Sequence, residues 1–481
     1  MSSKEIGITV KKNENFSEWY TQIVTKSGLI DYSPIKGFIV LKPYGYRIWE
    51  LIKEYLDEKL KSTGHQNGFL PVLIPESLLS KESDHFHGFI PEVFWVTKAG
   101  NNDLSDNLAV RPTSETLAYS IFSKWIMSYR DLPLKMNFWN SALRAEIKGT
   151  KPFIRNSEFL WQEGHTVHET LSEAKKEVSL ILDIYKSLIE EELAISTISG
   201  YKSEKEKFVG ALYTTTLESL MPDGKALQMA TSHNLGQNFS KPFEIRFLSK
   251  DSKQHFAWQT SWGISWRLIG ALIMIHGDDK GLILPPKISP IQVVIVPIFK
   301  NKNKDEVITT AKEIKSKLLD QDLRVYLDER DEYTSGWKFH DWEVKGVPLR
   351  INIGKRDIEK KVVELVRRDI QSKEFIKFND LEKIQLILND IQSSLYQRST
   401  QYQKSKIFSI SNYEKMRSIC DNDGGFIRTG WCGDEKCEEK IKNDIGADIR
   451  VIPFANQVSE ENKCILCNKD ASKTVIFAKA Y

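Results

Sequence analysis

The sequence has 481 residues, too many for one compact core, so we expect about two to four domains. Its 68 basic and 65 acidic residues give a net charge of +3, which excludes a histone-like nucleic-acid binder but allows local basic surfaces. No run approaches the ~20 apolar residues of a membrane-spanning helix, and the first residues lack the apolar segment of a secretory signal. We therefore expect an intracellular protein, whose five cysteines are thiols or metal ligands.

Residues 1–286 are predicted to form one mixed α/β region. Apolar residues at helical spacing predict amphipathic helices over 44–60 and 171–193. Between them, residues 69–74 are predicted to form a strand that ends at Pro75. We expect the apolar stripes of both helices to pack in the core.

A boundary is predicted at three prolines, Pro285, Pro286 and Pro290, which interrupt regular structure. Beyond them, short apolar strands (291–298, 323–327, 349–353, 362–366) alternate with helices (305–319, 381–395). This pattern predicts a compact α/β domain over 287–400. A third region, 401–481, has fewer apolar runs and holds all five cysteines.

Two arginine-bearing motifs lie in the first region. In RAEIKGTKPFIRNSEFLWQEGH (144–165), Arg144 and Glu146 are two apart, so on a strand they would share a face, and Arg155 follows a loop with glycine and proline. This pattern predicts a hairpin, either with solvated charges or with arginines that bind phosphate.

In QTSWGISWRLIGA (259–271), a strand is predicted to lead into a helix over 268–275, with Arg267 among apolar residues. A buried arginine requires an anionic partner. That partner could be a structural carboxylate, or the phosphates of a bent nucleotide held by two arginine-bearing elements.

These motifs, together with RPTSE (111–115), FLWQEGH, TSHNLGQNFSK, SWGISWR and HGDDKGLILPP, carry a family resemblance over nearly the whole chain. The sequence resembles class II aminoacyl-tRNA synthetases, and among them the prolyl-tRNA synthetases of the archaeal and eukaryotic type. The resemblance implies an α+β catalytic domain with an antiparallel sheet (1–286). An α/β anticodon-binding domain (287–400) and a small α/β zinc-binding C-terminal domain (401–481) would follow it.

The implied reaction is ATP-dependent ligation of L-proline to tRNA(Pro) through prolyl-adenylate, with release of AMP and diphosphate. Arg144 would hold the α-phosphate and the substrate carboxylate, and Arg267 the γ-phosphate. The remaining ATP site would comprise Glu146, Arg155, Asn156, Gln228, Thr231 and Ser265, with Mg²⁺ bridging the phosphates. Proline would be bound by Thr113, Glu115 and His233, between the aromatic walls Phe159 and Trp161.

Several of these residues have a structural alternative. His165 and His233 could each be a buried histidine that only supports the fold. Ala145 stands where many relatives have tryptophan, and Asn156 stands where threonine is common, but Asn156 keeps the capacity to form hydrogen bonds.

The middle domain resembles the anticodon-binding domain of the same synthetases. Its stretch GWKFHDWEVKGVPLRINIGKRD mixes basic and aromatic residues, as a surface that stacks bases and binds phosphates would. The candidate anticodon residues are Lys338, Glu343, Lys345, Arg350 and Arg356. Each could equally be a solvated surface charge.

The cysteines form two closely spaced pairs, Cys432 with Cys437 and Cys464 with Cys467. Two such pairs suit tetrahedral Zn²⁺, and a disulfide pair is the alternative. The fifth, Cys420, is expected to be a small buried residue.

Other expectations follow from the resemblance: a cytoplasmic homodimer, associated through the helix and strand of the first class motif (44–75), that does not act at a membrane. About 60 residues separate His165 from Gln228, too few for an inserted editing domain.

Two rival functions are a synthetase of the same subgroup for threonine or glycine, and an inactive paralogue that only binds RNA or protein. The pocket residues and the presence of both Arg144 and Arg267 argue against them.

Overall fold

The computed structural model describes residues 7–79, 93–145, 149–455 and 463–481. Its largest sheet has eleven strands in the order β20-β21-β23-β22-β9-β10-β11-β14-β8-β7-β3. The strands of the first region are β3 (Gln66–Gly68), β7 (Leu134–Leu143), β8 (Glu158–His168), β9 (Ile198–Tyr201), β10 (Tyr213–Leu220), β11 (Ala226–Gly236) and β14 (Trp258–Ser265). From β9 to β7 all neighbours are antiparallel, as expected for the catalytic domain of a class II synthetase.

One face of this sheet is covered by α5 (Leu171–Ser187), which ends in a π-helical turn (Leu188–Glu192). The helix begins at a capping box in which Thr170 and Glu173 each satisfy a backbone N–H of the other. Around it pack α1 (Phe16–Lys26), α2 (Pro43–Ser62) and α6 (Arg267–His276), which share one apolar core with the sheet. The helices predicted over 44–60 and 171–193 are therefore confirmed, the second with a π-helical last turn.

The predicted strand 69–74 is wrong. The chain instead forms β3 and, after a break, β4 (Leu73–Pro75), which pairs with β6 (Asn102–Val110) in a separate three-stranded sheet. Pro71 lies in the break, and Phe69 is 84% exposed. Proline cannot donate to a strand ladder, which explains why the apolar run does not continue as one strand.

The middle region forms a five-stranded sheet in the order β16-β15-β17-β18-β19. Its strands are β15 (Val293–Ile298), β16 (Val325–Leu327), β17 (Leu349–Gly354), β18 (Val362–Arg367) and β19 (Lys373–Lys377). Its helices are α7 (Lys304–Leu319), α8 (Ser335–Val344), α9 (Lys355–Lys360) and α10 (Lys383–Ser405). The predicted elements are confirmed except in length, because α10 extends ten residues beyond the predicted end at 395 and passes through the expected boundary at 400.

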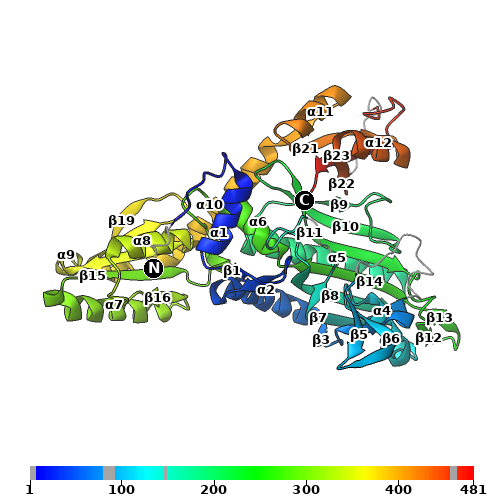
Figure 1. The fold of residues 1–481 in the computed structure, drawn as a ribbon, viewed down its shortest axis with the longest axis horizontal. Helices are drawn as coiled ribbons and strands as arrows, with labels where there is room; N and C mark the ends of the chain where they lie inside the picture. The colour runs from blue at the N-terminus through cyan, green and yellow to red at the C-terminus, as the bar shows by residue number, and fades with distance from the viewer. Residues whose placement is uncertain (1–6, 80–92, 146–148, 456–462) are drawn as a thin grey trace.

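The C-terminal region continues the largest sheet. It contributes β20 (Ile407–Ser409), β21 (Phe426–Trp431), β22 (Ala447–Pro453) and β23 (Lys473–Lys479), with α11 (Tyr413–Asp421) and α12 (Glu435–Ile445) beside them. Strand β22 joins β9 at Gly200, where a Cβ atom would lie 2.2 Å from the Ile452 carbonyl oxygen. Glycine is therefore required for this close approach, which joins two regions far apart in sequence (Figure 1).

The three regions are distinct in Figure 1: the five-stranded sheet lies at the left, the C-terminal helices at the upper right, and α5 with the antiparallel strands at the right, below those helices. Among the described residues, no helix is both long and apolar enough to cross a membrane.

Candidate functional site

The site lies on the face of the antiparallel sheet opposite α5. Strand residues alternate between faces, and two of them, Gln162 and Trp262, point toward α5: the Tyr185 hydroxyl donates to Gln162 Oε1 (2.6 Å), and the Trp262 ring lies 6.3 Å from that of Tyr185. Their neighbours in β8 and β14 therefore point to the other face. Strand register aligns these neighbours across three strands, pairing Trp161 with Ser265 and Ser261 with His233.

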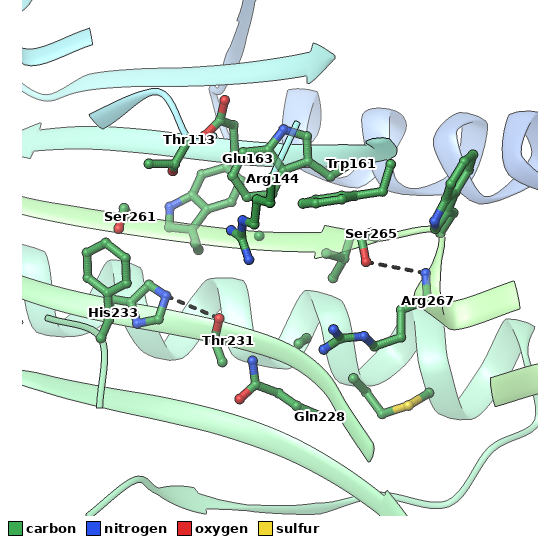
Figure 2. A pocket seen from close by; sticks show the side chains of 18 of the residues that line it. Thr113, Arg144, Trp161, Glu163, Gln228, Thr231, His233, Ser261, Ser265 and Arg267 are labelled. Carbon is green, nitrogen blue, oxygen red and sulfur yellow. Dashed lines mark hydrogen bonds between the residues drawn. The ribbon is translucent and has the colours of Figure 1, made fainter. Parts of the chain in front are cut away.

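A cavity of about 330 Å³ opens on this face. Every predicted proline and ATP residue except Glu146 lines it: Thr113, Glu115, Arg144, Arg155, Asn156, Phe159, Trp161, Gln228, Thr231, His233, Ser265 and Arg267. Glu146 lies outside the described residues. In Figure 2, Thr113, Ser261 and His233 lie toward one end, Gln228, Ser265 and Arg267 toward the other, and Arg144 between them.

Other residues that the sequence analysis did not assign also line the cavity, among them Glu163, Glu206, Phe208 and Ser261. Glu163 could have been found, because it lies two residues from Trp161 on the same strand, and period two places such residues on one face. Ser261 could have been found in the same way, since it lies four residues from Ser265 on one strand and pairs with His233. Glu206 and Phe208 lie in the connection between β9 and β10, and no motif marked them.

One end of the cavity is acidic and buried. Glu115 begins α4 (Glu115–Trp125) and accepts a hydrogen bond from the Thr113 hydroxyl. Glu163 accepts from the Ser114 hydroxyl and, at 2.9 Å, from Asn140 Nδ2. Burial raises the pKa of Glu115. Burial also opposes the charge on Glu163, but the hydrogen bond and charge of His165 outweigh it and lower the pKa of Glu163.

His165 supports this acidic end and does not line the cavity. Its Nδ1 lies 3.1 Å from the Tyr119 hydroxyl and its Nε2 lies 3.3 Å from Glu163 Oε2, and the ring is fully buried. Burial alone would lower its pKa, but the hydrogen bond to Glu163 and the charge of Glu115 raise it. Of the two alternatives for this histidine, the structure therefore favours the structural one.

His233 borders the cavity. Its Nδ1 lies 2.9 Å from Thr214 Oγ1, its Nε2 lies 3.1 Å from Thr231 Oγ1, and its ring lies 4.7 Å from that of Phe208. Burial, reinforced by His165, lowers the pKa of His233 to about 3, so the ring is neutral at pH 7. A neutral imidazole has one donor and one acceptor nitrogen, which suits it to orient a polar ligand.

The other end of the cavity is basic. Arg267 begins α6, and its Nε donates to the Ile154 carbonyl (3.3 Å). Arg144 follows the end of β7, and its guanidinium lies 5.2 Å from the centre of the Phe159 ring. Arg155 lies on the same β7–β8 connection. The predicted hairpin is confirmed, but Arg144 lies just beyond the strand that was expected to contain it. Arginines from two elements therefore line one cavity, as a polyphosphate ligand requires.

Two aromatic side chains form a wall between these ends. The rings of Phe159 and Trp161 meet edge to face at 5.7 Å, and Trp161 Nε1 donates to Asn140 Oδ1, which fixes the indole. This wall suits a small saturated ring with a nearby positive charge.

The four paired cysteines meet in the C-terminal region. The sulfurs of Cys432, Cys437, Cys464 and Cys467 all lie within 4.8 Å of one another. Cys432 Sγ is 3.7 Å from the sulfurs of both Cys437 and Cys467, too far for a disulfide. Zn–S bonds of ~2.3 Å in a tetrahedron place sulfurs about 3.8 Å apart, so the cluster fits such an ion.

The pKa values of the cysteines differ with their surroundings, and burial raises the pKa of Cys432 and Cys437. Burial opposes ionisation of Cys464, but backbone N–H groups outweigh it and lower the pKa of Cys464 to about 7. Cys420 lies apart from the cluster and is buried, which raises its pKa to about 11.

The anticodon candidates do not converge. Glu343 and Arg350 line a second hollow of about 160 Å³, together with Arg367, Arg368 and Lys373. Lys345 forms an ion pair with Asp341 (2.9 Å), and Arg356 lies exposed on α9. Lys338 is 2% exposed and donates to the Asp328 carbonyl (3.1 Å), so it does not lie on the surface of α8.

Comparison with protein families agrees with the three regions. Residues 94–276 match the class II tRNA synthetase core domain (G, H, P, S and T), 292–386 an anticodon-binding domain, and 413–481 the C-terminal domain of prolyl-tRNA synthetase. Fold and site thus define a class II aminoacyl-tRNA synthetase.

The relatives narrow this class. The chain is 55% identical to proline–tRNA ligase of Cenarchaeum symbiosum, with 99% of this chain and 100% of the relative covered. It is 49% identical to that of Natranaerobius thermophilus, with 98% and 97% covered. A solved prolyl-tRNA synthetase from Cryptosporidium parvum, in complex with halofuginone and AMPPNP, matches with a TM-score of 0.95 and 42% identity over 99% of this chain and 100% of that one. The chain belongs to the prolyl-tRNA synthetase family.

Proposed function

We propose that the protein ligates L-proline to tRNA(Pro) in two steps. The proline carboxylate attacks the α-phosphorus of ATP, forming prolyl-adenylate and releasing diphosphate. A terminal ribose hydroxyl of the tRNA then attacks the carbonyl carbon, and AMP leaves. One observation carries the proposal: Arg144 and Arg267 share a cavity with the acidic, aromatic-walled end at Thr113 and Glu115.

This chemistry needs no general base for the first step, because the substrate carboxylate is already a nucleophile. We assign Arg144 to the α-phosphate and proline carboxylate, and Arg267 to the γ-phosphate, where their charges stabilise the transition state. Arg155, Asn156, Gln228, Thr231 and Ser265 complete the ATP site, and Glu146 belongs to the same proposal. The AMPPNP in the Cryptosporidium parvum relative supports an ATP site. Mg²⁺ bound with ATP would neutralise phosphate charge.

For proline itself, we assign Thr113, Glu115 and His233 to its imino group and carboxylate and Phe159 and Trp161 to its ring. A carboxylate beside a cationic secondary amine, within an aromatic wall, selects for a charged saturated ring. Both ring nitrogens of His233 contact threonine hydroxyls, so the neutral ring would donate to the substrate carboxylate through Nε2 in place of Thr231.

We assign Zn²⁺ to Cys432, Cys437, Cys464 and Cys467 as a structural ion. Metal analysis of protein purified without added metal should find about one Zn²⁺ per chain, as four thiolates require. Because such sites contribute directly to folding, Cys464→Ser should make residues 401–481 susceptible to proteolysis. A metal-free protein with a protease-resistant C-terminal region would contradict this assignment.

We further propose the division into a catalytic domain (1–286), an anticodon-binding domain (287–400) and a zinc-binding domain (401–481), as in the archaeal and eukaryotic type. The protein would act in the cytoplasm as a homodimer, with anticodon contacts from Glu343, Lys345, Arg350 and Arg356. Lys338 would support that surface from beneath, since its amine is buried against Asp328.

We also propose that the enzyme has no editing domain. Residues 169–225, all of which the structure describes, form α5 and its π-helical turn, which pack on the sheet, and β9 and β10, which are strands of it. Alanine lacks two of the ring carbons of proline, and each missing methylene gives only ~1–3 kcal/mol of discrimination. The enzyme should therefore form some Ala-tRNA(Pro) and leave it intact, and rapid hydrolysis of preformed Ala-tRNA(Pro) would contradict this.

The decisive test is ATP–pyrophosphate exchange with each of the twenty amino acids. Proline alone should support rapid exchange. Exchange with threonine or glycine instead would favour the rival synthetases, and none with any amino acid would favour an inactive paralogue.

A further inference from the structure

The connection between β9 and β10, residues 202–212, joins the C-terminal region to the cavity. Two of its side chains, Glu206 and Phe208, line the cavity. The Phe208 ring lies 4.7 Å from that of His233, and the Phe208 N–H donates to Thr214 Oγ1 (2.9 Å), which also contacts His233. The position of this connection therefore determines how His233 is packed.

The start of the connection is held by Glu438 of α12. The Ser203 hydroxyl donates to Glu438 Oε1 at 2.6 Å, and both residues are 1% exposed. Ser203 Oγ also accepts from the Glu206 N–H (3.3 Å), and the Ser203 carbonyl accepts from the Lys207 N–H (2.9 Å). Glu438 thus orients the hydroxyl that shapes the turn leading to Phe208.

A second contact reaches the same turn. The Glu206 carboxylate lies between two cations of the C-terminal region, with Oε1 3.4 Å from Lys442 Nζ and Oε2 3.6 Å from Arg450 Nη1. Arg450 is itself fixed by the buried Glu218 of β10 through two hydrogen bonds of 3.0 and 3.1 Å. Both carboxylate oxygens of Glu206 therefore face the C-terminal region, which suits this residue to anchor the connection.

The cysteine cluster lies next to the residues of α12 that make these contacts. Glu438 directly follows Cys437, one of the four clustered cysteines, in the first turns of α12. Lys442 lies one turn further along the same helix. Anything that holds the start of α12 in place therefore also holds the residues that contact the connection.

We propose that Glu438 is a positioning residue for the proline site: through Ser203 it fixes residues 202–208 and thereby Phe208 and His233. This inference rests on the proposed function, since it assigns the affected end of the cavity to proline. It predicts a selective effect, because the contacts reach the His233 end and not the end with Arg267. A misplacement of a few tenths of an ångström at a binding group is enough to weaken its interaction.

The test uses the full chain in proline-dependent ATP–pyrophosphate exchange. Glu438→Ala and Ser203→Ala should each raise the KM for proline on the order of tenfold, as loss of a buried hydrogen bond to a charged group predicts. The KM for ATP and kcat should stay unchanged. The double variant should be no worse than either single variant, because both remove one interaction. Glu438→Gln, which keeps an acceptor oxygen, should restore most of the proline affinity.

Controls separate this effect from misfolding and from failure of the proposed function. Glu435→Ala removes an exposed acidic residue of the same helix and should leave both KM values unchanged. Ser203→Ala lies in the catalytic region and should retain the metal, so it remains informative if Glu438→Ala does not fold. An unchanged KM for proline in Ser203→Ala, or equal increases in KM for proline and ATP, would overturn the inference. If the wild-type chain shows no proline-dependent exchange, the proposed function fails instead.

Discussion

The cavity on the antiparallel sheet and the surface around α8 and β17 were both predicted from charged residues interspersed with aromatic ones, but their predicted residues are placed very differently. All described residues predicted for proline and ATP line one cavity. Of the five anticodon candidates, Glu343 and Arg350 share a hollow, Lys345 pairs with Asp341, Arg356 is exposed on α9, and Lys338 is buried.

The difference follows from how each region is built. In the cavity, period-two positions on adjacent antiparallel strands must face the same side, so a motif on β8 and a motif on β14 meet by register. On α8, residues at successive helical positions face different directions, so Lys338 points inward while Glu343 faces the hollow. A cluster in sequence becomes a cluster in space only where the backbone periodicity allows it.

The largest expected effect tests the convergence in the cavity. Arg144→Ala or Arg267→Ala should reduce proline-dependent ATP–pyrophosphate exchange by about 10²–10³-fold, because each removes a preorganised charge from the phosphates, ~2.7–4 kcal/mol. The matched control is Arg246→Ala, an exposed arginine on β12 (Arg246–Leu248) that does not line the cavity. Exchange near the wild-type rate in both cavity variants would remove these arginines from the active site.

A smaller effect is expected in the second region, and in a different reaction. Glu343→Ala combined with Arg350→Ala should reduce tRNA(Pro) aminoacylation at least tenfold, since each base-reading contact is worth about 1–3 kcal/mol. Pyrophosphate exchange should be unaffected, because these residues do not line the cavity.

The control for that variant is Glu359→Ala, an exposed residue on α9 of the same domain. A parallel loss of exchange and aminoacylation would show that Glu343 and Arg350 stabilise the fold instead of reading the anticodon.

Lys338 distinguishes burial from recognition within the second region. Lys338→Met keeps the apolar stem but removes the amine that donates to the Asp328 carbonyl (3.1 Å). We expect a loss of about 1–3 kcal/mol in stability, seen as a lower thermal unfolding midpoint, because a buried acceptor loses its partner. The KM for tRNA should not change below that midpoint. A raised KM for tRNA with an unchanged midpoint would place Lys338 in direct contact with RNA.

The sequence predicted much of the fold because long periodic segments determine their own structure. The helices at α2, α5 and α7 and the strands β15, β17 and β18 lie where apolar spacing placed them. The strand expected over 69–74 failed because Pro71 interrupts an otherwise suitable apolar run.

Other features depend on tertiary contacts that no local pattern reveals. The pairing of β22 with β9 joins residues about 250 positions apart, and the ion pairs of Glu206 with Lys442 and Arg450 depend on that pairing. Glu206 and Phe208 consequently reach the cavity from a connection that carries no motif. The cysteine cluster is the opposite case, since two short spacings were sufficient to predict it.

The smallest predicted effect concerns acid stability, which should differ between the same two regions. Burial lowers the pKa of His168 and His276 to about 4, from a usual value of 6.5, and that of His233 to about 3. Their lowered pKa values mean that the stability they contribute is present above pH 6.5 and is lost as the pH falls toward 4. Residues 292–386 contain one histidine, His340. Asp328 in the same region has a pKa below its usual 3.8, so the stability that Asp328 contributes is lost only below that pH.

Between pH 7 and pH 6, protonation of the unfolded chain should therefore cost the catalytic region about 0.7 kcal/mol for each of His168, His233 and His276, and leave residues 292–386 nearly unchanged. His165, whose pKa is raised, acts in the opposite direction. Hydrogen–deuterium exchange, corrected for the intrinsic pH dependence of the exchange rate, resolves the two regions in one experiment. His276→Gln keeps an N–H that can donate to the Leu193 carbonyl, which lies 2.9 Å from His276 Nε2, but cannot titrate. This variant should lose about one third of the pH effect attributable to the three histidines with lowered pKa values. An equal loss of protection in both regions, or an undiminished effect in His276→Gln, would show that the buried histidines do not control acid sensitivity.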